Sequence, residues 1–304
     1  MTKKQLQMKN HPFYFLVLGC LTIFIMYSKT IAESISQGIS LAMLSIVPSI
    51  FIFLVFSDFL ASNAEKIPHS KFISKLFSIP IGCEGALACG VICGFPCGVK
   101  YAVKLYEGGL LTKDELERVI GLVNNPSLAF VISAVGNGIF NSKKIGLMLF
   151  VSVLTSVIIT AHLYKSTSKE IAICEHISEQ TFSFSKSIKS AGLSSIIVSS
   201  YIIFFSAVLG ILKKTFKSTI FAALLAAILE IGNTVSILKT PGFDSNISFI
   251  ILGFALGFSG ISVHLQTIDI LPENVSLKKY YVIKITQGII CAIIASTLNL
   301  FIHS

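Results

Sequence analysis

Long apolar runs alternate with short polar stretches along the chain. A helix that spans a membrane needs about 20 mostly apolar residues. Runs of roughly this length cover residues 13–31, 38–60, 80–106, 118–139, 145–164, 191–212, 217–238, 247–268 and 280–302. The pattern predicts an all-α polytopic membrane protein with about seven to nine hydrophobic segments.

Four of these segments contain residues that interrupt a helix. Broken backbone at membrane depth persists only where protein buries it or where it lines a wet cavity. We therefore expect residues 80–106 and 247–268, which are rich in glycine, to form re-entrant hairpins. We expect residues 118–139 and 217–238 to be broken helices, because polar residues interrupt their apolar runs.

Composition supports a membrane protein. Hydrophobic residues make up 53% of the chain and charged residues only 13%, whereas a soluble domain carries about 25% charged residues. This excludes a soluble enzyme and a disordered protein. The net charge is +9, and the lysines lie between apolar runs. We interpret them as charges that orient the helices, with Lys3, Lys4 and Lys9 in the cytoplasm, and we expect no nucleic-acid partner.

The segments suggest two similar halves. We divide the chain into an N-terminal transmembrane helix (1–36), a first half (37–165), a polar linker (166–190) and a second half (191–304). Each half has one glycine-rich segment and one broken span, in opposite orders under this assignment. Paired interrupted segments are the sequence feature that points to the binding site of a transporter.

In the first half, candidate binding residues follow two helix breaks. Pro96 and Gly98 break the segment 80–106, and a helix that begins there presents free N–H groups that bind anions. Lys100 and Lys104 follow one turn apart and would complete an anion site, or would instead extend to the membrane interface. In the second break, Asn124, Asn125 and Ser127 surround Pro126 and offer polar groups to a substrate, or hydrogen bonds between helices.

In the second half, Glu230 lies in an apolar run. A carboxylate at that depth is costly and usually functional, so we assign it ion or proton coupling, with a structural pair to a lysine as the alternative. Glu84, near the mouth of the first hairpin, is a second coupling candidate. The remaining candidate substrate-binding residues of this half are Asn233, Thr234, Ser259, Ser262 and Gln266.

Catalytic chemistry has no support in the sequence. The HExxH, GxSxG and P-loop motifs do not occur, so we predict a protein that is not an enzyme and has no cofactor. Cys83, Cys89, Cys93 and Cys97 cluster without a CxxC pair or a nearby histidine. We interpret them as small packing residues and predict no metal site.

Five motifs occur together in order and resemble known families. They are Gly94-Phe95-Pro96-Cys97-Gly98-Val99-Lys100, Gly109-Leu110-Leu111-Thr112-Lys113-Asp114-Glu115, Asn124-Asn125-Pro126-Ser127, Leu229-Glu230-Ile231-Gly232-Asn233, and the stretch from Gly257 to Gln266. The set is similar to the nucleoside-recognition Gate domain and, more closely, to the YlbJ (SpoVV) family of sporulation integral membrane proteins. The resemblance implies a fold similar to concentrative nucleoside transporters.

The same resemblance implies a function. A member of the YlbJ family would move dipicolinic acid, a small planar dianion, from the mother cell across the outer forespore membrane. Two alternatives stay open: a nucleoside or other polar-solute transporter coupled to an ion through Glu230, and a spore-maturation membrane protein that transports nothing. We expect the lipid bilayer and the small anion as partners, and leave open a homo-oligomer or a sporulation membrane partner.

Overall fold

The computed structural model describes residues 3–62, 69–165, 183–216, 218–240 and 242–303, and regular structure in these ranges is helical. The predicted linker 166–190 lies outside the described residues up to residue 182. The helices, of which η1 and η3 are π-helices, are α1 (Lys3–Met26), α2 (Ser28–Leu41), η1 (Ala42–Ile46), α3 (Val47–Ser62), α4 (Lys71–Leu76), α5 (Glu84–Ile92), α6 (Cys97–Glu107), α7 (Lys113–Val123), α8 (Leu128–Phe130), η3 (Val131–Asn137), α9 (Gly138–Phe140), α10 (Lys143–Leu163), α11 (Phe184–Thr215), α12 (Thr219–Leu229), α13 (Ile231–Leu238), α14 (Ser245–Phe258), α15 (Ile261–Ile268) and α16 (Lys278–His303).

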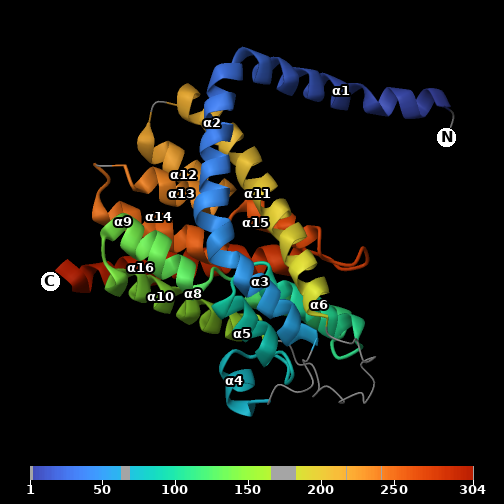
Figure 1. The fold of residues 1–304 in the computed structure, drawn as a ribbon, viewed down its shortest axis with the longest axis vertical. Helices are drawn as coiled ribbons and strands as arrows, with labels where there is room; N and C mark the ends of the chain where they lie inside the picture. Colours follow the sequence, from blue (N-terminus) through green and yellow to red (C-terminus); the bar gives the residue numbers. More distant parts are fainter. Residues whose placement is uncertain (1–2, 63–68, 166–182, 217, 241, 304) are drawn as a thin grey trace.

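The prediction of an all-α polytopic membrane protein is confirmed, but the number of spans is smaller than predicted. Among the described residues, six helical stretches are long and apolar enough to cross a membrane: Ser28–Ser57, Lys113–Phe140, Lys143–Leu163, Phe184–Thr215, Ser245–Ile268 and Lys278–Leu300. Three of the apolar segments therefore need another explanation. Residues 80–106 and 217–238 form short helix pairs. Residues 13–31 are divided near Tyr27 between α2 and α1, and α1 projects away from the body (Figure 1).

Residues 80–106 form a helical hairpin, as predicted. The chain turns between α5 and α6 at Gly94, whose φ is +82°, and Pro96. The two helices then pack side by side, because a Cβ on Gly98 would lie 3.0 Å from the Cα of Gly90 and 3.0 Å from the carbonyl oxygen of Ala86. Glycine at this crossing lets the backbones touch.

The second hairpin is not where the sequence placed it. Residues 217–238, predicted to be a broken span, fold back at Glu230, whose backbone is extended between α12 and α13. Ser218 and Thr219 at the start of α12 share a pocket with Ile237 and Thr240 at the end of α13. The ends of the segment therefore lie together, and Glu230 is its tip.

Residues 247–268, predicted to be a hairpin, form a broken spanning helix instead. Helix α16 runs antiparallel beside the whole segment: Asn299 contacts Ser245 at the start of α14, and Tyr280 contacts His264 in α15. Gly253 and Gly257 do not turn the chain. They let α14 approach α16, since a Cβ on either glycine would lie 2.7 Å from α16 backbone.

The two halves consequently have the same order of elements, which corrects the predicted reversal. Each has a long helix, a hairpin, a broken helix and a further spanning helix. The base of the first hairpin lies near the start of α16, where Asn274 donates to Tyr106 at the end of α6. The base of the second shares a pocket with the start of α14, where Ser245 contacts Asn299 near the end of α16. Helix α16 is long and apolar enough to cross a membrane, so the two hairpin bases lie at opposite ends of one candidate span, as in the inverted repeats of many transporters.

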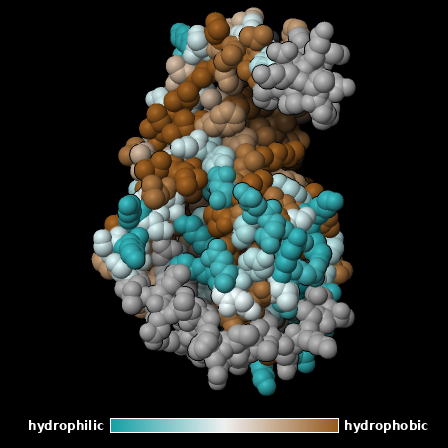
Figure 2. All heavy atoms as spheres, turned by 90° about the vertical axis from the view of Figure 1, so that its right-hand side faces the viewer, coloured by the Kyte–Doolittle hydropathy of each residue, from teal (hydrophilic) through white to brown (hydrophobic). Residues whose placement is uncertain are grey.

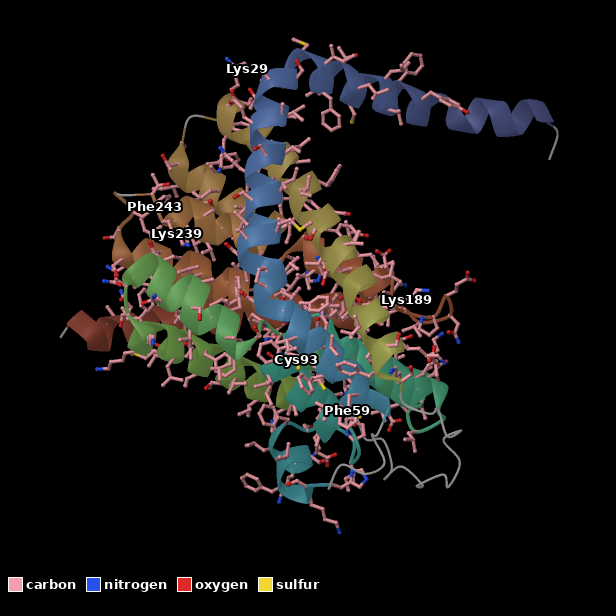
Figure 3. All side chains as sticks on the ribbon, in the orientation of Figure 1. Lys29, Phe59, Cys93, Lys189, Lys239 and Phe243 are labelled. Atoms are coloured by element: carbon pink, nitrogen blue, oxygen red, sulfur yellow. The ribbon has the colours of Figure 1, made fainter. Side chains whose placement is uncertain are left out.

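The crossing of α2–α3 and α11 completes the body. A Cβ on Gly38 of α2 would lie 2.8 Å from Ser206 Oγ of α11, and one on Gly210 of α11 would lie 2.0 Å from Ser34 Oγ. Small residues at such a crossing permit close contact between membrane helices. In Figure 3, Lys239 beyond α13 lies at one edge of the body, Lys189 near the start of α11 lies at the other, and Cys93 lies between them.

Candidate binding site between the hairpin tips

A cavity of about 40 Å³ lies where the two hairpin tips, the two broken helices and the crossing pair meet. Its walls are Cys93, Gly94 and Phe95 from the first tip, Glu230 and Ile231 from the second, Ser127, Phe130, Val263 and Gln266 from the broken helices, and Ile46, Ile50, Val198 and Ile202 from the crossing helices. Both halves thus supply equivalent elements. A volume of this size holds about one to three water molecules.

Each hairpin tip touches the break of the helix that follows it. A Cβ on Gly94 would lie 2.8 Å from the backbone nitrogen of Ser127, in the break between α7 and α8. In the second half, a Cβ on Gly260, in the break between α14 and α15, would lie 3.3 Å from the carbonyl oxygen of Leu229. A tip therefore meets a break in both halves, and glycine is favoured at both positions because their φ values are +82° and +84°.

Among the described residues that line the cavity, Glu230 is the only one with a charged side chain, and it caps α13. Its oxygens accept from the Gly232 N–H (2.9 Å), the Asn233 N–H (2.6 Å) and the Asn233 Nδ2 (2.8 Å). Ser206 of α11 in turn lies 3.0 Å from Asn233 Nδ2. No lysine pairs with Glu230 among the described residues, so backbone and amide donors, rather than a salt bridge, satisfy this carboxylate.

Asn124 and Asn125 lie behind the cavity and join the two halves. Asn124 Nδ2 donates to Thr267 Oγ1 and to Tyr280 Oη, both at 2.9 Å, and the side chain is fully buried. Asn125 Oδ1 accepts from Gln287 Nε2 at 2.7 Å. The amides therefore tie the first broken helix to α15 and α16, which is the alternative role that the sequence left open for them.

Lys284 completes this network and was missed by sequence reasoning. Its fully buried ammonium group donates to the Asn124 carbonyl oxygen (2.8 Å) and to Gln287 Oε1 (2.9 Å), and it forms no salt bridge among the described residues. A cation at the last carbonyls of α7 complements the helix dipole. The sequence feature that could have identified Lys284 is its position inside the apolar run 280–302. Because Lys278 and Lys279 lie just before it, Lys284 resembles one more charge at the start of the helix.

The start of α15 supplies polar groups beside the cavity. Gln266 lines the cavity and donates to Ser262 Oγ at 3.3 Å. Ser259 is fully buried in a left-handed conformation (φ +78°), and its hydroxyl has no partner among the described residues. No described side chain caps α15. The N–H groups of Val263 and His264 donate to the Gly260 carbonyl oxygen, which leaves those of Ile261 and Ser262 available to an acceptor.

The other predicted site residues lie away from the cavity wall. Lys100 and Lys104 are half-buried on α6 beyond the tip, and Lys100 donates to Ser194 Oγ on α11. Glu84 lies at the far end of α5, where it accepts from Ser74 Oγ and from the backbone N–H groups of Ser70 and Gly82. Thr234 is buried and bonds to the Glu230 carbonyl oxygen within α13.

Comparisons with known proteins support part of the resemblance. No family model and no solved structure matches the chain. The chain is similar to the sporulation integral membrane protein YlbJ of Bacillus subtilis (strain 168). The two are 22% identical over 311 aligned residues, which cover 86% of this chain and 76% of that protein. This is a distant relative along most of its length, and it supports an integral membrane protein related to a sporulation protein.

Proposed function

We propose that the protein is a membrane carrier, not an enzyme, for a small organic anion. The anion that the resemblance implies is dipicolinic acid, carried across the outer forespore membrane during sporulation. The observation that carries the proposal is the cavity between the tips of two hairpins whose bases lie at opposite ends of α16. In inverted-repeat transporters, substrates bind where such elements meet near the middle of the membrane.

Neutral donors favour an anion at this site. The uncapped start of α15 and the unpartnered Ser259 hydroxyl lie at the second break, and Gln266 lines the cavity. A helix start of this kind binds carboxylates without a lysine. The cavity of about 40 Å³ is too small for a dicarboxylate, so binding requires the tips to separate. In this proposal the structure is a closed state of the carrier.

One observation favours a second candidate. The charged group on the cavity wall is the Glu230 carboxylate, which would repel a dianion and would accept hydrogen bonds from a neutral polar solute. A nucleoside is the solute that the Gate-domain resemblance implies. Substrate competition therefore has to decide between an anion and a nucleoside.

Uptake of labelled dipicolinate into proteoliposomes tests the proposal, with nucleosides and citrate as competitors. We expect saturable uptake that dipicolinate analogues inhibit. Gln266→Ala should reduce uptake about tenfold, because a buried hydrogen-bonding group at the site is lost. Gln37→Ala, on an exposed face of α2, is the matched control and should keep full uptake.

Three other results would contradict the proposed anion, its site or transport itself. Inhibition by nucleosides alone would favour the second candidate. Equal uptake by Gln266→Ala and Gln37→Ala would place the substrate elsewhere. Absence of flux from folded protein, with or without an ion gradient, would favour a spore-assembly protein that transports nothing.

A further inference from the structure

A second pocket lies at one membrane boundary, apart from the central cavity. It has a volume of about 510 Å³ and is formed where α7 begins, α10 ends and α16 begins. Its wall shares no residue with the central cavity. Figure 2 shows hydrophilic residues gathered on the side of the body where α6 and the α15–α16 connection lie in Figure 1.

The only arginine of the chain, Arg118, lines this pocket, and two of its three guanidinium nitrogens lack a described hydrogen-bond acceptor. Its side chain is 5% exposed, and its Nε and Nη1 atoms are buried with no hydrogen-bond acceptor among the described residues. The structure shows no salt bridge from it to a described carboxylate. A buried guanidinium group without an acceptor is costly, so an acceptor from outside the chain would stabilise it.

The acidic residues near Arg118 on α7 are occupied elsewhere. Asp114 forms an ion pair with Lys279. Glu115 accepts from the Thr112 N–H at 2.9 Å in the capping box of α7. Glu117 accepts from the Ser276 N–H at 2.9 Å. Each carboxylate therefore has a structural partner. Asp114 and Glu115 attract the guanidinium group through space, but neither forms a salt bridge with it, so its buried N–H groups can still donate to an added acceptor.

The remaining pocket wall is basic and borders an apolar surface. Lys165 and Lys278 are exposed beside Arg118, and Lys279 with Asp114 completes the charged part. Leu163, 64% exposed on α10, belongs to the same wall. A basic pocket between membrane helices at the boundary is the kind of site that holds an anionic lipid headgroup.

We propose that this pocket binds a phosphate group, with the Arg118 guanidinium as the buried donor and Lys165 and Lys278 as the outer cations. Arginine recognises phosphate oxygens through two parallel hydrogen bonds. Two sources share this chemistry: the headgroup of an anionic phospholipid, whose chains would lie along Leu163, and a free phosphate from the aqueous phase. The site is independent of the proposed transport.

The test uses the purified full chain in a neutral detergent. The probes are phosphatidylglycerol, phosphatidylcholine and inorganic phosphate at constant ionic strength, and the readouts are lipid adducts in native mass spectrometry and the melting temperature. We expect phosphatidylglycerol, but not phosphatidylcholine, to bind and to raise the melting temperature. Each basic side chain removed should weaken binding about fivefold.

Two variants and one control make the test decisive. Arg118→Gln removes the buried donor, and the double variant Lys165→Gln/Lys278→Gln removes only exposed charges, so it reports even if Arg118→Gln fails to fold. The control Lys143→Gln/Lys144→Gln makes the same change of net charge at the opposite, exposed end of α10. It should bind as the wild type does.

The results separate the two sources of phosphate. A response to phosphatidylglycerol alone identifies a lipid site. Saturable stabilisation by inorganic phosphate that is lost in the double variant identifies a free-anion site. The proposal is overturned if neither phosphatidylglycerol nor inorganic phosphate binds. It is also overturned if the Lys165→Gln/Lys278→Gln protein binds phosphatidylglycerol and inorganic phosphate as tightly as the control does.

Discussion

The packing of the first hairpin against the α7 break makes Gly90→Ala the most informative substitution for the site geometry. A Cβ on Gly90 would lie 1.9 Å from the carbonyl oxygen of Val123, the last residue of α7. Atoms of these types do not approach closer than about 3 Å. The hairpin or α7 would have to move by more than about 1 Å, and both elements hold the cavity wall.

The magnitude follows from two opposing terms. Alanine in place of glycine inside a helix stabilises it by about 0.5–1 kcal/mol. Overpacking against immovable backbone costs about 1–3 kcal/mol and sometimes more. The clash at Val123 involves backbone on both sides, so the upper end of that cost applies. The net expectation is a loss of about 2 kcal/mol in the free energy of unfolding.

Gly192→Ala is the matched control, because a Cβ there meets nothing within 4 Å although the residue also lies inside a helix, α11. It should stabilise the protein by about 0.5–1 kcal/mol. The assay is thermal unfolding of both variants in lipid nanodiscs, with monodispersity checked first. The two variants should shift the melting temperature in opposite directions. A Gly90→Ala protein as stable as Gly192→Ala would refute the contact between the hairpin and the α7 break, and with it the wall of the cavity.

Two further substitutions test the buried polar groups. Glu230→Gln replaces an oxygen that accepts an N–H bond with an NH₂ group and should cost about 1–3 kcal/mol, seen as a lower melting temperature. The exposed Glu107→Gln should stay within about 0.5 kcal/mol, and equal stability of the two variants would show that the cap contributes nothing. Lys284→Glu would place a carboxylate against the Asn124 carbonyl oxygen, so we expect the variant to lose its monodisperse peak in gel filtration. The exposed Lys144→Glu should keep that peak. A well-folded Lys284→Glu protein would contradict the hydrogen-bond network around Lys284.

The membrane class and the positions of the helix breaks could be predicted from the sequence. Long apolar runs with few charges are stable in lipid whatever their tertiary contacts, so the class follows from composition. Breaks at Pro96 and at Asn124–Ser127 follow from local backbone chemistry, since proline lacks an N–H and restricts the residue before it. Glu230 stood out as a lone carboxylate in an apolar run, and the structure places it at the cavity.

The direction of the chain after each break required the tertiary structure. A glycine in an apolar run either turns the chain or lets another helix approach, and the sequence does not distinguish the two. Gly94 turns the chain, whereas Gly253 and Gly257 pack against α16. For that reason the sequence predicts the second hairpin at residues 247–268, whereas the structure has it at residues 217–238.

Depth and partnership of the charged side chains also depended on the tertiary structure. Lys100 and Lys284 are both lysines within apolar segments, yet Lys284 is fully buried at the α7 break while Lys100 extends to α11. The cost of burying a charge is set by the groups that surround it in space. Hydrophobic composition thus determined that the chain is a membrane protein, and local backbone chemistry determined where two of its helices break. Contacts between residues distant in sequence decided which polar groups meet.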